Sequence, residues 1–123
     1  MYHPLCQSML LSPSNSTEHS QAIALDGASK VLIVADQIAI SGTPNVVLKS
    51  QTSEDMVNWV TPVVGSPNQN ELQLTATAPA HGESGSPAGT AISVEAQYIR
   101  LVYTMTAIGA SALIGAGVEV SRE

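Results

Sequence analysis

The sequence predicts an all-β fold: an antiparallel β-sandwich or jelly roll of about seven or eight short strands, with an extended N-terminal arm. Short runs rich in β-branched and aliphatic residues recur along the chain, and several alternate apolar and polar side chains with a period of two. Clusters of Gly, Pro, Asn, Asp and Ser separate these runs. No apolar pattern of helical period continues for more than about ten residues.

The composition fits one β domain with few charges on its surface. The chain has 123 residues, enough for one domain with a hydrophobic core and too few for two ordinary domains. Hydrophobic residues make up 44% of the chain, but only 11% of residues are charged, against about 25% in an average soluble domain. Ser, Thr, Asn and Gln must therefore cover much of the surface, which suits flat strands or contacts with neighbouring subunits.

The first twenty residues differ from the rest of the chain. Residues 1–20 are polar, contain two prolines and a Ser-rich patch, and show no clear period, so we expect an extended or weakly ordered arm. They lack the basic segment and sustained apolar core of a signal peptide. Residues 21–123 are expected to form a single β-sandwich domain.

The strand-like runs follow one another from residue 21, with turn clusters at residues 26–27 and 41–45 and a surface loop expected at residues 79–90. The expected strands are residues 21–25, 30–40, 46–53, 70–78, 90–96, 97–106 and 113–121. Within four of these strands the alternation places one set of side chains on one face, and in the last strand, residues 113–121, that face is expected to meet a core. That set is Val46, Leu48, Leu72, Leu74, Ala76, Ile99, Leu101, Tyr103, Met105, Ile114, Ala116, Val118 and Val120.

The longest uncharged stretch allows two interpretations. Residues 101–118 carry no charge, and their number reaches the lower limit for a transmembrane helix. Arg100 and Glu119 bound the stretch closely, and both of its ends alternate with a period of two. A β-hairpin that turns near residues 108–111 explains the same residues and is the favoured interpretation, with a membrane span as the alternative.

Charge and cysteine content exclude several functions. The formal net charge is −6, and the four basic residues are scattered, so the chain lacks the clustered Lys and Arg that neutralise nucleic-acid phosphates or anionic lipids. Cys6 is the only cysteine, which excludes a disulfide within these residues and favours folding in a reducing cytoplasm. We expect no direct contact with nucleic acid or a membrane, and we interpret Cys6 as an inert thiol.

No catalytic, cofactor-binding or metal-binding pattern is visible. His3, His19 and His81 lie far apart, whereas zinc ligands that are close in sequence come in pairs a few residues apart. The adjacent Glu54 and Asp55 lack the further alternating ligands of a calcium loop, so they predict a solvated acidic turn. The sequence therefore predicts a protein that is not an enzyme and that needs no cofactor or metal.

The single tryptophan also allows two interpretations. Trp59 follows a polar, acidic turn in a chain that has no phenylalanine and three tyrosines. Its indole could be an exposed platform for a sugar ring, or an anchor in the core or at a strand edge that buries a large apolar area. Because no other aromatic residue stands at a neighbouring strand position, the anchor is the favoured interpretation.

Residues 53–59, SEDMVNW, and residues 96–101, AQYIRL, form a recognisable pair in their order and separation. The first is similar to an S-x-D-G-x-x-W turn, and the second resembles an A-R-Y-I/V-R-L strand, of discoidin-like jelly rolls and small phage virion proteins. Met56 stands where the turn has glycine, and Gln97 stands where the strand has its first arginine. The low charge, the short length and the lack of a disulfide fit the phage proteins better.

The resemblance implies roles for five residues. Ser53 and Asp55 would form the turn, Trp59 would fold back onto the sheet, and Tyr98 and Arg100 would lie across one face of the later strand as structural anchors. The expected function is that of a small auxiliary virion protein, a capsid decoration or cement protein made in the host cytoplasm. Its expected partners are the major capsid protein or other virion subunits and further copies of itself, with a trimer as the working hypothesis.

Other classes of function remain as alternatives to this expectation. A ligand-binding β-sandwich, either a carbohydrate-binding or an adhesion module, is the main one and depends on an exposed Trp59. A small membrane protein of the holin type would require residues 101–118 to span a bilayer.

Overall fold

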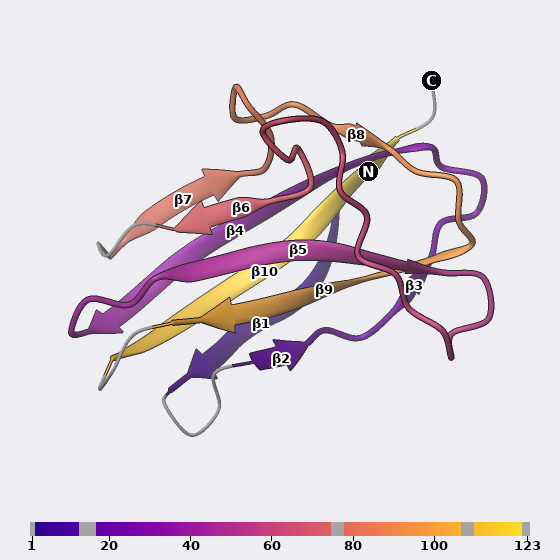
Figure 1. Cartoon of the computed structure of the whole chain (residues 1–123). Coiled ribbons are helices and arrows are strands. Elements are labelled where there is room, and N and C mark those ends of the chain that lie inside the picture. Colours follow the sequence, from indigo (N-terminus) through magenta and orange to yellow (C-terminus); the bar gives the residue numbers. More distant parts are fainter. Residues whose placement is uncertain (1, 13–16, 75–77, 107–109, 122–123) are drawn as a thin grey trace.

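The computed structural model describes residues 2–12, 17–74, 78–106 and 110–121, and within them the chain is all-β with no helix (Figure 1). The predicted fold class, an antiparallel β-sandwich, is confirmed. The described residues form ten strands rather than seven or eight. The strands are β1 (Tyr2–Leu11), β2 (Thr17–His19), β3 (Ile23–Ala24), β4 (Lys30–Ser41), β5 (Val46–Ser53), β6 (Leu72–Leu74), β7 (Ala80–Glu83), β8 (Ile92–Ser93), β9 (Tyr98–Met105) and β10 (Ser111–Ser121).

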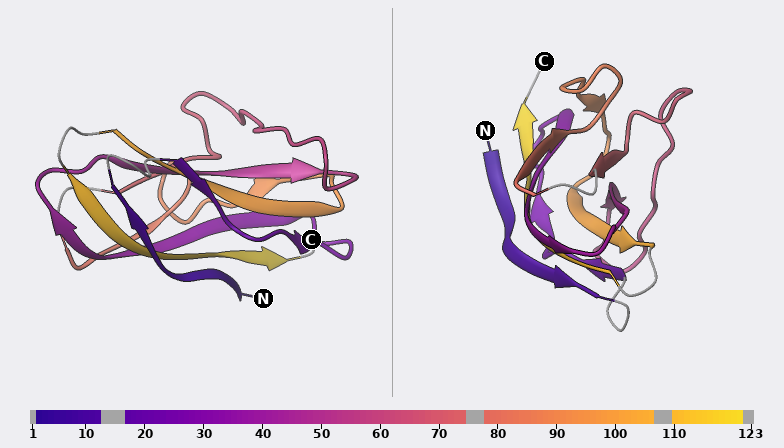
Figure 2. Two further views of the ribbon diagram at one scale, coloured as in Figure 1. Left: turned by 90° about the horizontal axis from the view of Figure 1, so that it is seen from below. Right: turned by 90° about the vertical axis from the view of Figure 1, so that its left-hand side faces the viewer.

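The strands make two antiparallel sheets, which Figure 2 shows as two layers. Sheet 1 has the order β1-β10-β4-β7, and β8 pairs with the start of β4. Sheet 2 has the order β2-β9-β5-β6, and β3 pairs with the start of β9. Among the described strands the chain changes sheet six times: from β1 to β2, β3 to β4, β4 to β5, β6 to β7, β8 to β9 and β9 to β10.

The faces predicted from this alternation are the core faces of their strands wherever the structure describes them. Strand β9 alternates half-buried and buried side chains over its whole length, and β5 begins with the same alternation. The apolar faces of the two sheets meet in one core, as the amphipathic pattern requires. Every residue of the predicted set is buried there except Ala76, which lies outside the described residues.

Residues 2–11 of the predicted extended or weakly ordered arm form a paired strand of the sandwich, so this segment is not separate from the sandwich domain. Strand β1 pairs with β10 along the edge of sheet 1, with partners that run from Tyr2 opposite Glu119 to Leu11 opposite Ala112. Leu5 and Leu11 are buried in the core. The strand could not be recognised from the sequence, because Pro4 and two breaks in the pairing register interrupt its alternation.

The uncharged stretch at residues 101–118 is neither a helix nor a hairpin. Strand β9 belongs to sheet 2, whereas β10 belongs to sheet 1, so the chain crosses the sandwich between them. Each strand keeps the predicted alternation but pairs with partners distant in sequence. Residues 107–109, which include part of the predicted turn, lie outside the described residues. No helix in the part of the chain that the structure describes is long and apolar enough to cross a membrane.

The loop predicted at residues 79–90 contains strand β7. Gly82 lies opposite Ala35 of β4, and a Cβ atom added to it would come within 2.8 Å of the Leu72 side chain of β6. Glycine therefore lets β7 pack closely against β6, which belongs to the other sheet. The high content of Gly, Pro and Ser predicted a loop and concealed this short strand.

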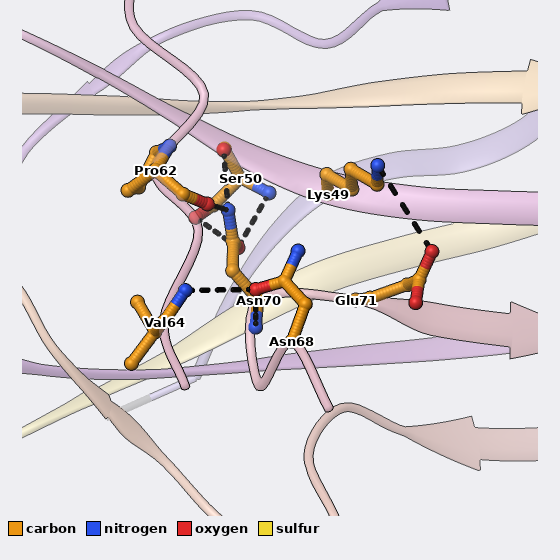
Figure 3. Close-up of polar contacts among 7 residues, drawn as sticks. All are labelled: Lys49, Ser50, Pro62, Val64, Asn68, Asn70 and Glu71. Atoms are coloured by element: carbon orange, nitrogen blue, oxygen red, sulfur yellow. Dashed lines mark hydrogen bonds and ion pairs between the residues drawn. The ribbon is translucent and has the colours of Figure 1, made fainter. Parts of the chain in front are cut away.

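A buried asparagine fixes the long segment between β5 and β6. Asn70 is fully buried, and its side-chain oxygen accepts hydrogen bonds from the backbone N–H (2.9 Å) and the hydroxyl (2.6 Å) of Ser50 (Figure 3). Its side-chain NH2 donates to the backbone carbonyls of Ser50 (3.0 Å) and Pro62 (2.8 Å). Beside it, the Asn68 side chain accepts from the backbone N–H groups of Val64 and Asn70. The segment is thus tied to the middle of β5 by side chains.

Candidate functional site

The turn that follows β5 closes on itself through an isolated pair of backbone hydrogen bonds. The Thr52 N–H donates to the Val60 carbonyl at 2.9 Å, and the Val60 N–H donates to the Thr52 carbonyl at 3.0 Å. Both views of Figure 2 show the segment between β5 and β6 on the side of sheet 2 that faces away from sheet 1. Residues 53–59 therefore form a closed projection on the outside of the sandwich.

Two side chains predicted as turn residues, Ser53 and Asp55, organise this projection. The Ser53 hydroxyl oxygen accepts hydrogen bonds from the N–H groups of Asp55 (3.2 Å) and Met56 (2.9 Å), and the hydroxyl donates to the Asp55 carboxylate at 3.0 Å. The same carboxylate accepts from the N–H groups of Val57 (2.9 Å) and Asn58 (2.8 Å) and from the Asn58 side chain (2.8 Å). These bonds hold the backbone of the turn in one conformation.

Met56 stands where the turn motif that this segment resembles has glycine. Its backbone nevertheless adopts the left-handed conformation. Met56 has a φ of +62°, a conformation that costs a non-glycine residue about 1–2 kcal/mol. The hydrogen bond from its N–H to Ser53 helps to offset that cost. Its side chain is exposed.

The hydrogen bonds received by Asp55 hold its pKa well below the ordinary value of 3.8. The largest cause is the bond from the Asn58 N–H, followed by the bond from the Val57 N–H and then the bonds from the Asn58 and Ser53 side chains. Each of these bonds favours the ionised carboxylate. Asp55 is therefore a permanent negative charge at neutral pH.

Replacing Asp55 with asparagine is expected to lower the melting temperature at neutral pH, because the turn then loses its charge-assisted hydrogen bonds. The folded-state pKa lies below the unfolded value, so the carboxylate's contribution is complete above 3.8 and is lost as the pH falls below it. Thermal unfolding of both proteins across acidic pH measures this. The gap in melting temperature should persist down to about pH 4 and then narrow; a gap already lost at pH 6 would contradict the lowered pKa.

The indole lies on the outside of sheet 2, next to the arginine of β9. The Arg100 guanidinium carbon is 4.2 Å from the centroid of the Trp59 ring, and Arg100 Nε donates to the Gln51 side chain at 2.8 Å. Gln51 in turn donates to Thr61 at 3.0 Å. Trp59 is half-buried and is not part of the core between the sheets. The contact attaches the end of the turn to the sheet surface through a cation–π interaction.

The structure brings the five residues implied by the resemblance into one region. Gln51 and Ser53 lie opposite Arg100 and Tyr98, respectively, in the register between β5 and β9. Tyr98 and Arg100 are half-buried and alternate with the buried Ile99. Desolvation by burial lowers the pKa of Arg100, but a guanidinium still remains charged at neutral pH. The proposed role of Trp59, Tyr98 and Arg100 as structural anchors stays a prediction.

Replacing Trp59 with alanine is expected to lower the free energy of unfolding by about 2 kcal/mol, because a half-buried indole and its cation–π contact are lost. A double-mutant cycle with Arg100→Ala should show a coupling of about 0.5–1 kcal/mol. Urea denaturation followed by circular dichroism measures all four proteins. A loss above about 4 kcal/mol would indicate a core indole instead, and zero coupling would show that the stacked contact does not stabilise the fold.

An open groove of about 340 Å³ runs beside the turn. It is lined by polar and acidic residues of the turn together with the segment before β9; the lining residues are Thr52, Ser53, Glu54, Asp55, Asn58, Val60, Glu95 and Ala96. Three of these residues carry carboxylates. No group of three or more His, Cys, Asp or Glu side chains in the described ranges is arranged to hold a metal ion.

Four exposed apolar side chains lie in the turn and in the residues just after it, and the sequence analysis did not predict their exposure. Met56 is 49% exposed, Val57 77%, Val60 62% and Val63 76%. Only Leu10 and Ile38 are comparably exposed among the large apolar side chains that the structure describes. The sequence did contain a signal for this exposure: large apolar residues stand within a polar turn, which is too small to bury them.

The histidines and the cysteine do not join this region. His81 lies across from Asp36 on the outer side of sheet 1, with Nδ1 2.7 Å from the carboxylate, and both side chains are exposed. His19 is exposed on β2. The side chains of His3 and Cys6 lie outside the part of the chain whose side chains are described.

Comparison of the sequence with protein-family models and with curated proteins gives no match. The geometry of the turn and of its surroundings must therefore support any statement about function.

Proposed function

We propose that the chain is a non-enzymatic structural protein of a virus particle, a capsid decoration or cement protein that stabilises the particle through contacts with neighbouring subunits. The observation that carries the proposal is the turn after β5. Its hydrogen bonds fix the backbone, while Met56, Val57 and Val60 are exposed to solvent. A rigid scaffold that presents ordered apolar side chains suits binding to another protein, because little conformational entropy remains to be lost.

The outer side of sheet 1 supports a second contact, with another copy of the chain. Leu10, Leu113 and Ala39 lie opposite one another across β1, β10 and β4, and the exposed Ile38 follows in the same part of β4. Such a row is an apolar strip on the surface of a sheet.

Mass spectrometry of purified particles tests the proposal. Particles of the virus that encodes the chain should contain it in many copies, and those that lack it should lose their contents at lower temperature or ionic strength. Light scattering of the isolated protein should give a discrete oligomer, with a trimer as the working hypothesis. Particles without the chain would refute the virion assignment.

A ligand-binding sandwich is the second candidate. The observation that favours it is the position of Trp59, half-buried on an outer surface near a groove lined by Asn58 and Asp55. Carbohydrate sites combine an aromatic ring with a few polar groups in the same way. The Arg100 guanidinium, however, covers one part of the ring at 4.2 Å. Tryptophan fluorescence that shifts with one member of a glycan panel would favour this candidate over the virion protein.

A further inference from the structure

We propose that the apolar loop, defined as Met56, Val57, Val60 and Val63, binds a different protein whose surface is an apolar hollow with lysine and arginine at its margin. The inference rests on the proposed structural role and names the chemistry of the partner. It excludes a second copy of the chain as the occupant of this site.

The first step concerns the fixed shape of the loop. The Asp55 carboxylate accepts from the N–H groups of Val57 and Asn58, and the Thr52–Val60 bonds close the turn. The Asn68 side chain accepts from the Val64 N–H, directly after the last residue of the loop. The apolar side chains therefore project from a backbone that is held at both ends, so little conformational entropy would be lost when a partner binds.

The second step concerns the amount of apolar surface. The four side chains are between 49% and 77% exposed, and they fall within eight consecutive residues. Exposed large apolar side chains that lie this close together in the chain mark interaction sites more often than the same residues scattered singly. A hollow is the shape that receives a projection, as in interfaces where apolar anchors fill pockets.

The third step concerns charge. Glu54, Asp55 and Glu95 line the groove beside the loop, and Glu54 and Glu95 are exposed. Arg100 is the basic residue of the neighbouring strand β9. Its guanidinium lies against the Trp59 ring and donates to Gln51. The margin of the loop is therefore negative. A partner with lysine and arginine around its hollow would complement it.

The fourth step excludes a second copy of the chain. The formal net charge is −6, so two copies that met at this acidic margin would repel each other. The basic residues that the structure describes already have partners: Lys30 donates to Ser93 at 2.9 Å, Lys49 lies 4.0 Å from Glu71, and Arg100 donates to Gln51. No cluster of basic residues is present in the described ranges to receive the loop.

The experiment measures binding of the purified chain to particles prepared without it, by co-sedimentation at low and high salt. The double variant Val57→Ser/Val63→Ser should bind at least about tenfold more weakly than the wild type. The charge reversal Glu54→Lys/Glu95→Lys should weaken binding about tenfold at low salt and less at high salt. The control Ala88→Ser/Ala91→Ser introduces the same side chain at two exposed positions outside both proposed contact surfaces and should bind within about twofold of the wild type.

The outcomes separate the inference from the proposed function. Wild-type binding that the loop variant retains overturns the inference and leaves the structural role intact. Wild-type protein that does not bind particles overturns both. If the loop variant loses binding but salt and charge reversal have no effect, the claim that the partner carries lysine and arginine around its hollow is wrong. Light scattering of the isolated loop variant must match the wild type, since a changed oligomeric state would assign the loop to a second copy.

Discussion

Replacement of Asn70 with alanine is expected to lower the free energy of unfolding by about 3–4 kcal/mol. The Asn70 side chain makes four hydrogen bonds inside the protein: its oxygen accepts two, and its NH2 group donates two. Alanine would leave the N–H and carbonyl of Ser50 and the carbonyl of Pro62 without these partners, at about 1–3 kcal/mol for each buried group that water cannot reach. The substitution also frees the segment between β5 and β6 from the strand.

Urea denaturation measures this effect, and two further variants define its cause. Asn70→Asp keeps the size of the side chain but removes both donors to the carbonyls of Ser50 and Pro62, so it should be at least as damaging as alanine. Asn45→Ala, at an exposed asparagine, should change the free energy of unfolding by less than about 0.5 kcal/mol. If Asn70→Ala behaved like Asn45→Ala, the buried network would not hold the segment.

Two adjacent leucines of β1 give the second large effect. Leu11→Ala is expected to lower the free energy of unfolding by about 3 kcal/mol, because the Leu11 side chain is fully buried in the core. Leu10→Ala should cost less than about 0.5 kcal/mol, because the Leu10 side chain is 58% exposed on the opposite face of the same strand. Denaturant unfolding of the two variants compares the same chemical change on the two faces.

The pair tests whether the N-terminal segment belongs to the sandwich. Deletion of residues 1–11 removes the whole of β1 and both of its core leucines, so the shortened chain should not fold to a stable state. Equal effects of the two alanine substitutions, or a stable shortened chain, would show that the segment is an arm after all.

Much of the fold could be predicted because the central strands obey a local rule. A strand buried on one face must alternate, so Ile99, Leu101 and Tyr103 could be assigned to one face of β9 from the sequence alone, and that face is the buried one. The same rule does not say which strand pairs with which. That β9 and β10 lie in opposite sheets depends on packing between residues distant in sequence, and adjacency in the chain wrongly predicted a hairpin.

The candidate site was also predictable only in its local part, the turn itself. Ser53 and Asp55 stand at spacings from which their side chains reach the following backbone N–H groups, so the turn could be read locally. The stacking of Arg100 on Trp59 depends on the register of β9 against β5, which no local pattern contains. Asn70 carried no signal, because a buried asparagine and a solvated one look alike in a polar loop.

Amide hydrogen exchange at Val57 and Asn58, followed by NMR, tests the central claim most directly. The claim is that the turn after β5 is an ordered contact element and not a mobile loop. Both amides donate to the Asp55 carboxylate, so they should exchange slowly despite their exposed position, and Asp55→Ala should remove the protection. Exchange in the wild type as fast as in an unfolded peptide would contradict the claim, because a mobile turn could not present the apolar loop in a fixed arrangement.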